Sequence, residues 1–185
     1  MMFRRVFFSL SLIAAFAVPS FGQVLKNDKE KSKIDFVGKK DVGKKEEAKH
    51  AGGFKDFKSE LKIDLETPNK STLMVEIATE SLWADDEKLT SHLKNPDFFD
   101  VKKYPTIKFE STKIEVSENK ATITGKMTLL DKTIYETITT TNELSDTSLK
   151  IVAEFKIDRT KYGMNYGKGK VDDNVELKIV LVFPR

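Results

Sequence analysis

The sequence predicts an all-β fold: about eight antiparallel strands in a sandwich or a barrel, with one short helical insertion around residues 86–94. Apolar and polar residues alternate over most of the chain, which is the pattern of strands that bury one face. The alternating segments are short and are separated by turn residues, as in antiparallel sandwiches and barrels. Helical spacing occurs in only one segment, near residue 90, and this favours a single helix.

The alternation begins at Ile34 and Phe36 and recurs to the end of the chain. The predicted strands are 34–36, 57–65, 73–78, 107–109, 121–129, 134–138, 149–157 and 175–183. Eight strands close into a barrel that side chains can fill or that can hold a slender ligand. Because the same alternation is expected for a dry core and for a lined cavity, the pattern leaves both interiors open.

The helical insertion has its own start and stop signals. Asp85 or Asp86 can cap its first turn, and Leu89 and Leu93 stand four residues apart on one face. Asn95–Pro96 ends the helical pattern, because the residue before a proline avoids helical geometry. The sequence therefore predicts a short amphipathic helix that packs against the sheet.

The N-terminus has the layout of a secretory signal peptide. Arg4 and Arg5 precede an apolar run over residues 6–18, and small residues follow up to Gly22. The prediction is a signal peptide at 1–22 and a mature domain at 23–185, located in the periplasm or secreted. The alternative is an uncleaved membrane anchor, although the apolar run is short for spanning a bilayer.

Composition excludes several function classes. Loss of Arg4 and Arg5 lowers the net charge from +3 to +1, so no electrostatic attraction to nucleic acid is expected. The chain has no cysteine, which excludes disulfides, thiolate catalysis and cysteine-bound zinc. His50 and His92 are the only histidines and match no zinc motif, and Gly-x-Ser-x-Gly is absent. We predict no metal site and no catalytic residue.

Two loops carry the most informative side chains. Phe98 and Phe99 lie in a polar, proline-bounded loop, where such apolar bulk must be buried or reserved for a ligand. Arg159 ends a strand and begins a loop with three glycines and two tyrosines. It is either a polar clamp at a cavity mouth or the partner of a strand-end carboxylate, Asp158 or Asp172.

Residues 92–111, which contain the paired phenylalanines, closely resemble the hallmark segment of the YceI-like family of lipocalin-like, polyisoprenoid-binding periplasmic proteins. Further resemblance, in the same order, lies in segments 32–36, 50–57, 125–129, 155–164 and 175–179. Together the resemblance covers about residues 28–184. Two departures are the missing glycine in the turn at 129–132 and the charged stretch at 37–49, which bears on the position of His50 relative to the cavity.

The resemblance implies an extended, eight-stranded antiparallel lipocalin-like barrel. Its apolar tunnel would bind, transport or store an isoprenoid such as a prenyl quinone, without catalysis and with no other cofactor. The expected partner is an isoprenoid or another long apolar lipid. We expect no binding to nucleic acid and no stable membrane insertion after signal cleavage. A homodimer is compatible with the family. His50, Arg159 and Tyr162 are candidates for contact with the head group. The predicted lipid-binding residues are Phe36, His50, Phe54, Phe57, Trp83, Leu89, Leu93, Phe98, Phe99, Tyr104, Phe109, Met127, Phe155, Arg159 and Tyr162.

Two alternatives remain open. A filled barrel would act through its outer surface as a structural or stress-response interaction module. An enzyme acting on a bound lipid would need a polar cluster inside the barrel. For Trp83 and the pair Phe54 and Phe57, a role in the core competes with ligand contact, because buried aromatic residues serve both purposes.

Overall fold

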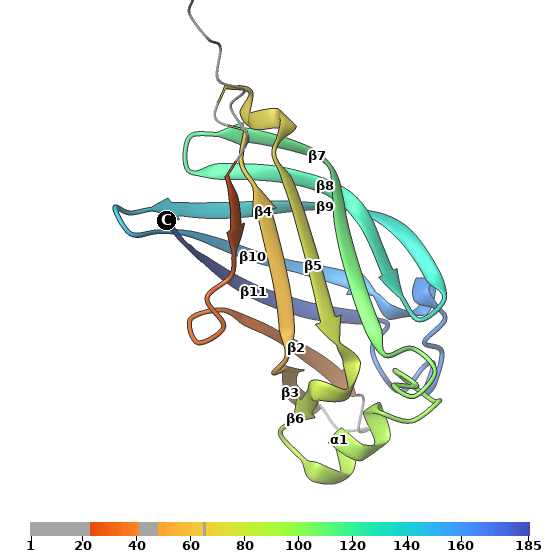
Figure 1. The fold of residues 1–185 in the computed structure, drawn as a ribbon. Helices are drawn as coiled ribbons and strands as arrows, with labels where there is room; N and C mark the ends of the chain where they lie inside the picture. The colour runs from red at the N-terminus through yellow and green to blue at the C-terminus, as the bar shows by residue number, and fades with distance from the viewer. Residues whose placement is uncertain (1–22, 41–47, 65) are drawn as a thin grey trace, which may run out of the picture.

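The computed structural model describes residues 23–40, 48–64 and 66–185; the predicted signal peptide and the predicted strand end at Leu65 lie outside this part. The described residues form one antiparallel sheet of eleven strands and one α-helix (Figure 1). The sheet is strongly curled, so that β4, β5 and β7 face β10, β11 and β2 across an apolar interior. This arrangement is a half-barrel.

All eight predicted strands are confirmed. They are β2 (Lys33–Lys40), β4 (Phe57–Lys62), β5 (Thr72–Ala78), β7 (Thr106–Ser117), β8 (Lys120–Leu129), β9 (Lys132–Leu144), β10 (Ser148–Asp158) and β11 (Asn174–Pro184). Three more strands are present, namely β1 (Val24–Lys26), β3 (Ala48–Phe54) and β6 (Leu82–Ala84). Single-turn 3-10 helices lie at η1 (Pro68–Lys70), η2 (Thr79–Ser81) and η3 (Arg159–Tyr162).

The prediction of an eight-stranded closed barrel was wrong in strand number and in closure. The strand order is β1-β4-β5-β7-β8-β9-β10-β11-β2-β3-β6, so β1 and β6 are the edges of an open, curled sheet. Both edge strands have three residues, too few to show alternation. Strand β3 contains Gly52–Gly53, which strands disfavour, and it forms because β2 and β6 pair with it on either side.

The predicted helix is confirmed as α1 (Glu87–Leu93). Asp86 has extended backbone geometry, and its side chain accepts a hydrogen bond from the Leu89 amide at 2.8 Å, as an N-cap does. The helix ends before Asn95, whose carbonyl accepts from the amides of Phe98 and Asp100. The chain therefore folds back directly after α1 and places the Phe98–Phe99 turn beside it.

A short segment at the β1 edge connects the two walls of the half-barrel. On the β4 side, the Asn27 amide donates to the Ser59 carbonyl, and the Asn27 side chain accepts from the Ser59 amide at 2.6 Å. On the β11 side, the Asp28 amide donates to the Val182 carbonyl at 2.7 Å, and the Ser32 hydroxyl accepts from the Val182 amide at 3.0 Å. Main-chain and side-chain hydrogen bonds together link β4 and β11 here, where no strand ladder joins them. We call residues 27–32 the seam.

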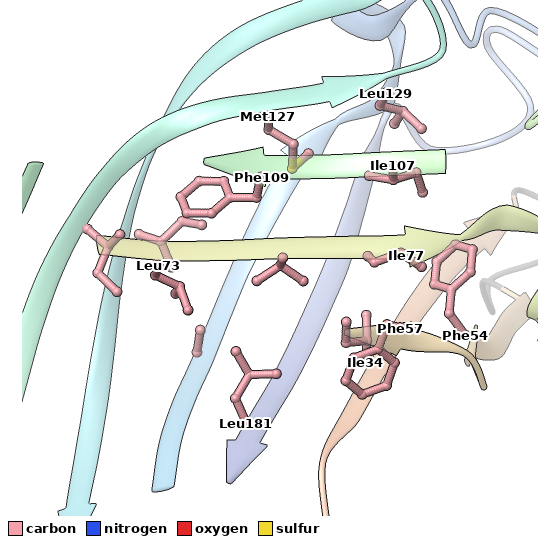
Figure 2. Close-up of a cluster of buried hydrophobic side chains, with 14 of the residues drawn as sticks. Ile34, Phe54, Phe57, Leu73, Ile77, Ile107, Phe109, Met127, Leu129 and Leu181 are labelled. Atoms are coloured by element: carbon pink, nitrogen blue, oxygen red, sulfur yellow. The ribbon is translucent and has the colours of Figure 1, made fainter. Parts of the chain in front are cut away.

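The inner face of the sheet carries the hydrophobic core. Figure 2 shows side chains of β5 and β7 directed toward those of β8 and β11, with Phe109 next to Met127. In β5 and β8, buried residues alternate with more exposed ones, and in β5 Leu73, Val75 and Ile77 point inward. The alternation in the sequence is therefore the direct cause of a single apolar interior.

Candidate lipid-binding cavity

The interior of the half-barrel is not completely filled. A cavity of about 180 Å³ lies along it, lined by side chains from β2, β3, β5 and β7 to β11, from α1 and from the loop after η3. This is roughly ten times the space that one water molecule needs. The lining is apolar, and such cavities in proteins stay dry and accept apolar ligands.

The polar side chains among the described lining residues are Thr140 and Arg159, and both are occupied. The Thr140 hydroxyl lies 2.9 Å from the Asn142 side-chain oxygen and 3.3 Å from the Ala121 carbonyl. Every donor of Arg159 is likewise taken by the protein, as described below. The cavity therefore offers hydrocarbon contact and no unsatisfied polar group, which selects for an apolar chain.

The turn after α1 closes one end of the cavity with aromatic rings. Phe99 packs edge-on against Phe54, with ring centroids 5.6 Å apart, and Phe54 in turn lies 6.1 Å from Phe36. Phe98 contacts the ring of Tyr166 at 5.2 Å, from the loop that follows η3. Phe98 and Phe99 both line the cavity, so their apolar bulk forms its end wall.

Arg159 is 2% exposed and organises the loop over residues 163–173. Its guanidinium has five N–H groups, and all five have acceptors. They donate to the carbonyls of Met164, Tyr166, Val171 and Asp172 and to the Asp173 carboxylate, over 2.6–3.4 Å. The sequence left two alternatives for Arg159: a polar clamp at the cavity mouth or a pair with a strand-end carboxylate. The structure shows a pair with a carboxylate, but that carboxylate belongs to Asp173. No N–H remains for a ligand head group.

Tyr162 is the last residue of η3; it is fully buried and does not line the cavity. Its hydroxyl donates to Glu136 Oε1 at 2.7 Å. Burial, followed by the hydrogen bond to Glu136 and its negative charge, raises the pKa of Tyr162 well above its usual range. The phenol therefore stays neutral and ties η3 to β9.

His50 lies at the rim of the cavity, not inside it. It stands opposite Gly38 in the β2–β3 pair, and Gly38 is a lining residue with open space beyond its α-carbon. Its Nδ1 is 3.2 Å from the Asp85 carboxylate, which also accepts from the Ala51 amide at 2.9 Å. The Ala51 hydrogen bond, with a contribution from His50, lowers the pKa of Asp85. This rim is polar and accessible.

The structure brings nine of the fifteen predicted site residues to the cavity wall. They are Phe36, Phe54, Leu93, Phe98, Phe99, Phe109, Met127, Phe155 and Arg159. Leu89 packs against the core from α1, and Tyr104 lies in the turn before β7. Phe57 and Trp83 line a separate groove on the surface next to β2 and β3. With His50 and Tyr162, these six are outside the lining.

Sequence reasoning missed most of the aliphatic lining. Ile77, Ile138, Leu177 and Ile179 line the cavity but were not selected as site residues. The signal was present, because the alternation already assigns them to the inner face of their strands. Aromatic residue type selected Phe57 and Trp83 as well, and these two line the surface groove instead of the cavity.

The described part of the chain contains no group of three or more His, Asp or Glu side chains that could hold a metal ion. Within the same residues, no helix combines the length and the apolar character needed to cross a membrane.

Curated relatives from Pseudomonas species match about two fifths of the chain. A UPF0312 protein of Pseudomonas putida is 40% identical over 79 residues, which are 42% of this chain and 41% of that protein. A UPF0312 protein of Pseudomonas aeruginosa is 36% identical over 78 residues, with the same coverage. The chain therefore aligns with well under half the length of these curated relatives.

Solved structures share the fold over most of the chain. Burkholderia cenocepacia BcnA superposes with a TM-score of 0.74 at 27% identity, covering 84% of this chain and 98% of that one. A Campylobacter jejuni YceI protein gives 0.66 at 21% identity, covering 72% and 84%. A polyisoprenoid binding domain from Saccharophagus degradans gives 0.64 at 13% identity, covering 88% and 98%.

The sequence model of the YceI-like domain family matches residues 25–183, from the first strand to the last. This range contains all of the curled sheet but the first residue of β1 and the last residue of β11, together with α1, the Phe98–Phe99 turn and the loop held by Arg159. The expectation drawn from the segment at 92–111 is confirmed, and the chain belongs to the YceI-like domain family.

Proposed function

We propose that the protein binds the hydrocarbon chain of an isoprenoid lipid, such as a prenyl quinone, and carries or stores it without a catalytic step. The observation that supports this most strongly is the 180 Å³ cavity whose polar lining groups are all occupied. A ligand with polar groups along its length would leave them unpaired inside. A hydrocarbon chain has no such groups.

Burial supplies the binding free energy in this proposal. Each methylene-sized group removed from water contributes about 0.8 kcal/mol, so a five-carbon isoprene unit contributes about 4 kcal/mol before the loss of its own freedom is subtracted. The end wall of Phe54, Phe98 and Phe99 would meet one end of the chain. The head group would stay at the polar rim near His50 and Asp85.

Likeness to other proteins adds the ligand class. The Saccharophagus degradans domain, which has the same fold, is a polyisoprenoid binding domain. At 13% identity that likeness concerns the fold, so we extend the ligand to this chain as a proposal. The pattern of residues 1–22 supports export to the periplasm or the medium, where the lipid would be taken up, and a homodimer is compatible with the proposal.

Native mass spectrometry of the protein purified from its own cells tests the proposal. We expect a mass above that of the polypeptide, which organic extraction lowers to the polypeptide mass, and an isoprenoid in the extract. Phe155→Asp places a charge in the cavity wall and should abolish loading, because an unpaired charge is strongly disfavoured there. The same spectra report monomer or dimer.

Tyr135→Asp is the matched control, since Tyr135 is 62% exposed on β9 and absent from the cavity lining. It should load like the unmodified protein. If extraction changes no mass, the protein is better described as an interaction module that acts through its surface. If folded Phe155→Asp still carries lipid, the ligand is not in this cavity.

A further inference from the structure

Two phenylalanine rings lie directly on glycines of the neighbouring strand. A β-carbon placed on Gly52 would be 2.4 Å from Cζ of Phe36, and one placed on Gly125 would be 2.5 Å from Cζ of Phe109. Real β-carbons never approach other atoms so closely, so each ring occupies the space that a side chain would fill. We call these two contacts the ring–glycine pairs.

Both ring–glycine pairs face the interior. Phe36 and Phe109 line the cavity, and each glycine has the strand parity of inward residues, as Gly125 has between Ile123 and Met127. The rings therefore lie back into the wall instead of standing out into the lumen. A side chain at either glycine would push the ring toward the centre of the lumen. The shift would be about 1 Å or more, because the ring now lies about 2.5 Å from the β-carbon position and an ordinary contact needs 3.5–4 Å.

The first pair belongs to a continuous row across the sheet. Phe155 on β10 stands opposite Leu177 on β11, Leu177 stands opposite Phe36 on β2, and Phe36 stands opposite Gly52 on β3. Three large side chains thus meet in one row of the wall. Gly52, at the end of the row, has no side chain and so leaves space for the Phe36 ring. Without Gly52 this row would have no room to spread.

Gly38 shows that the effect is specific to the ring–glycine pairs. It also lines the cavity, but no atom lies within 4 Å of where its β-carbon would be. An added methyl group at Gly38 would point into open space and move no ring. Gly38 therefore lines the cavity without a ring lying on it.

We propose that the ring–glycine pairs determine ligand specificity by making the lumen wide enough for a methyl-branched chain, so that the protein prefers isoprenoid chains to linear acyl chains. This rests on the proposed function. A linear chain is slimmer than a chain with a methyl branch on every isoprene unit. A shift of a ring by about 1 Å is comparable to the space that a methyl branch needs, so the branched chain is excluded first.

The test measures binding of two alcohols of equal carbon number, geranylgeraniol and the linear eicosanol, by displacement of a fluorescent apolar probe. The unmodified protein should prefer geranylgeraniol. Gly125→Ala should lower the branched-to-linear affinity ratio by about tenfold, which corresponds to about 1.4 kcal/mol. Tyr135→Ala, which changes an exposed side chain outside the cavity lining, should leave the ratio unchanged.

A second variant leaves the glycines intact, because a β-carbon on Gly125 would also lie 2.6 Å from the Glu110 carbonyl oxygen and strain the backbone. Phe109→Leu removes the ring and widens the lumen, so a linear chain loses wall contact that a branched chain keeps. The ratio should rise by about threefold or more. In the double variant with Gly125→Ala, Phe109→Leu should restore the preference for geranylgeraniol.

The outcomes separate the two proposals. If the unmodified protein binds neither alcohol, the proposed function fails and this inference fails with it. If it binds both alcohols with equal affinity, or if the ratio stays within about twofold in Gly125→Ala and Phe109→Leu alike, the cavity binds lipid but the ring–glycine pairs do not set its specificity.

Discussion

At the scale of single residues, Arg159 links chemistry to architecture. It is a buried cation whose hydrogen bonds go mainly to main-chain carbonyls of one loop. Lining residues Met164 and Val171 belong to that loop. Arg159 therefore contributes to the cavity by holding part of its wall in place.

We expect Arg159→Ala to lower the free energy of unfolding by about 3 kcal/mol, because the buried Met164 carbonyl and three partly buried carbonyls would lose their donor. Urea denaturation followed by tryptophan fluorescence measures this. Arg185→Ala is the control, since that exposed side chain makes one 3.4 Å hydrogen bond and its loss should change stability by less than about 0.5 kcal/mol. Equal effects of the two variants would contradict the role assigned to Arg159.

Tyr162 gives the stability of the protein a dependence on alkaline pH. Its pKa is raised in the folded state, mainly by burial, so above about pH 10 the unfolded chain loses this proton first. The contribution is fully present below about pH 10, and stability then falls by up to about 1.4 kcal/mol per pH unit as pH rises.

Tyr162→Phe should remove that part of the alkaline slope and also lower stability at neutral pH, because Glu136 loses its donor. Urea unfolding at several values from about pH 8 to 11 gives both quantities. Tyr135→Phe, at an exposed tyrosine, controls for loss of a hydroxyl as such. If Tyr162→Phe keeps the full alkaline slope, another buried group is responsible for it.

At the scale of elements, α1 depends on one cap. The helix has only two turns, so its hydrogen bonds alone cannot maintain it, and its anchors are the Asp86 cap and the buried Leu93. The Thr90 hydroxyl, which accepts from the Ala84 amide at 2.9 Å, adds a link to β6. Because Leu93 lines the cavity, the stability of this helix bears directly on the end wall.

Asp86→Ala should therefore destabilise the protein by about 1 kcal/mol through loss of the bond to the Leu89 amide. Hydrogen exchange should become faster in α1 and in the Phe98–Phe99 turn, while the central strands keep their protection. Asp146→Ala, in the exposed turn between β9 and β10, removes a carboxylate elsewhere and should have little effect. Uniformly faster exchange over the sheet would argue against a local role for the cap.

At the scale of the whole molecule, the seam keeps the curled sheet together at its β1 edge. Asn27→Ala removes the acceptor of the buried Ser59 amide and should lower the free energy of unfolding by about 1–3 kcal/mol. The Ser59 hydroxyl is itself buried without a partner among the described residues. Ser59→Ala should therefore be neutral or slightly stabilising, although it changes the same site.

Urea denaturation of the two seam variants distinguishes these effects. A loss of stability in Asn27→Ala together with unchanged or higher stability in Ser59→Ala would show that the seam acts through the Asn27 acceptor. A comparable loss in both variants would instead indicate a water-mediated or packing role for the Ser59 side chain.

The sequence predicted eight strands and α1 correctly because their signals are local. Alternation in β5 and the Asp86 cap with its Leu89 and Leu93 face depend only on neighbouring residues. Strand β3 was missed because its two glycines and charged start have poor strand propensity, and pairing with β2 overrides that. Edge strands of three residues are below the length at which a period can be recognised.

The candidate site was predictable in part for the same reason. Phe98 and Phe99 stood out as apolar bulk in a polar loop, and both line the cavity. The role of Arg159 could not be predicted, because its acceptors are carbonyl groups, which every residue has. The resemblance made Tyr162 a candidate for head-group contact, and the structure directs its hydroxyl to Glu136.

The sequence by itself determined which residues face inward, where the helix begins and ends, and the family to which the chain belongs, since period and local motifs encode these. Only the tertiary structure decided that the sheet is an open half-barrel of eleven described strands, that its interior keeps a cavity, and that the rings of Phe36 and Phe109 lie on glycines. These depend on how strands distant in sequence pair and pack. Whether an apolar interior is filled or hollow is set by the fit of side chains across walls, and no single strand contains that information.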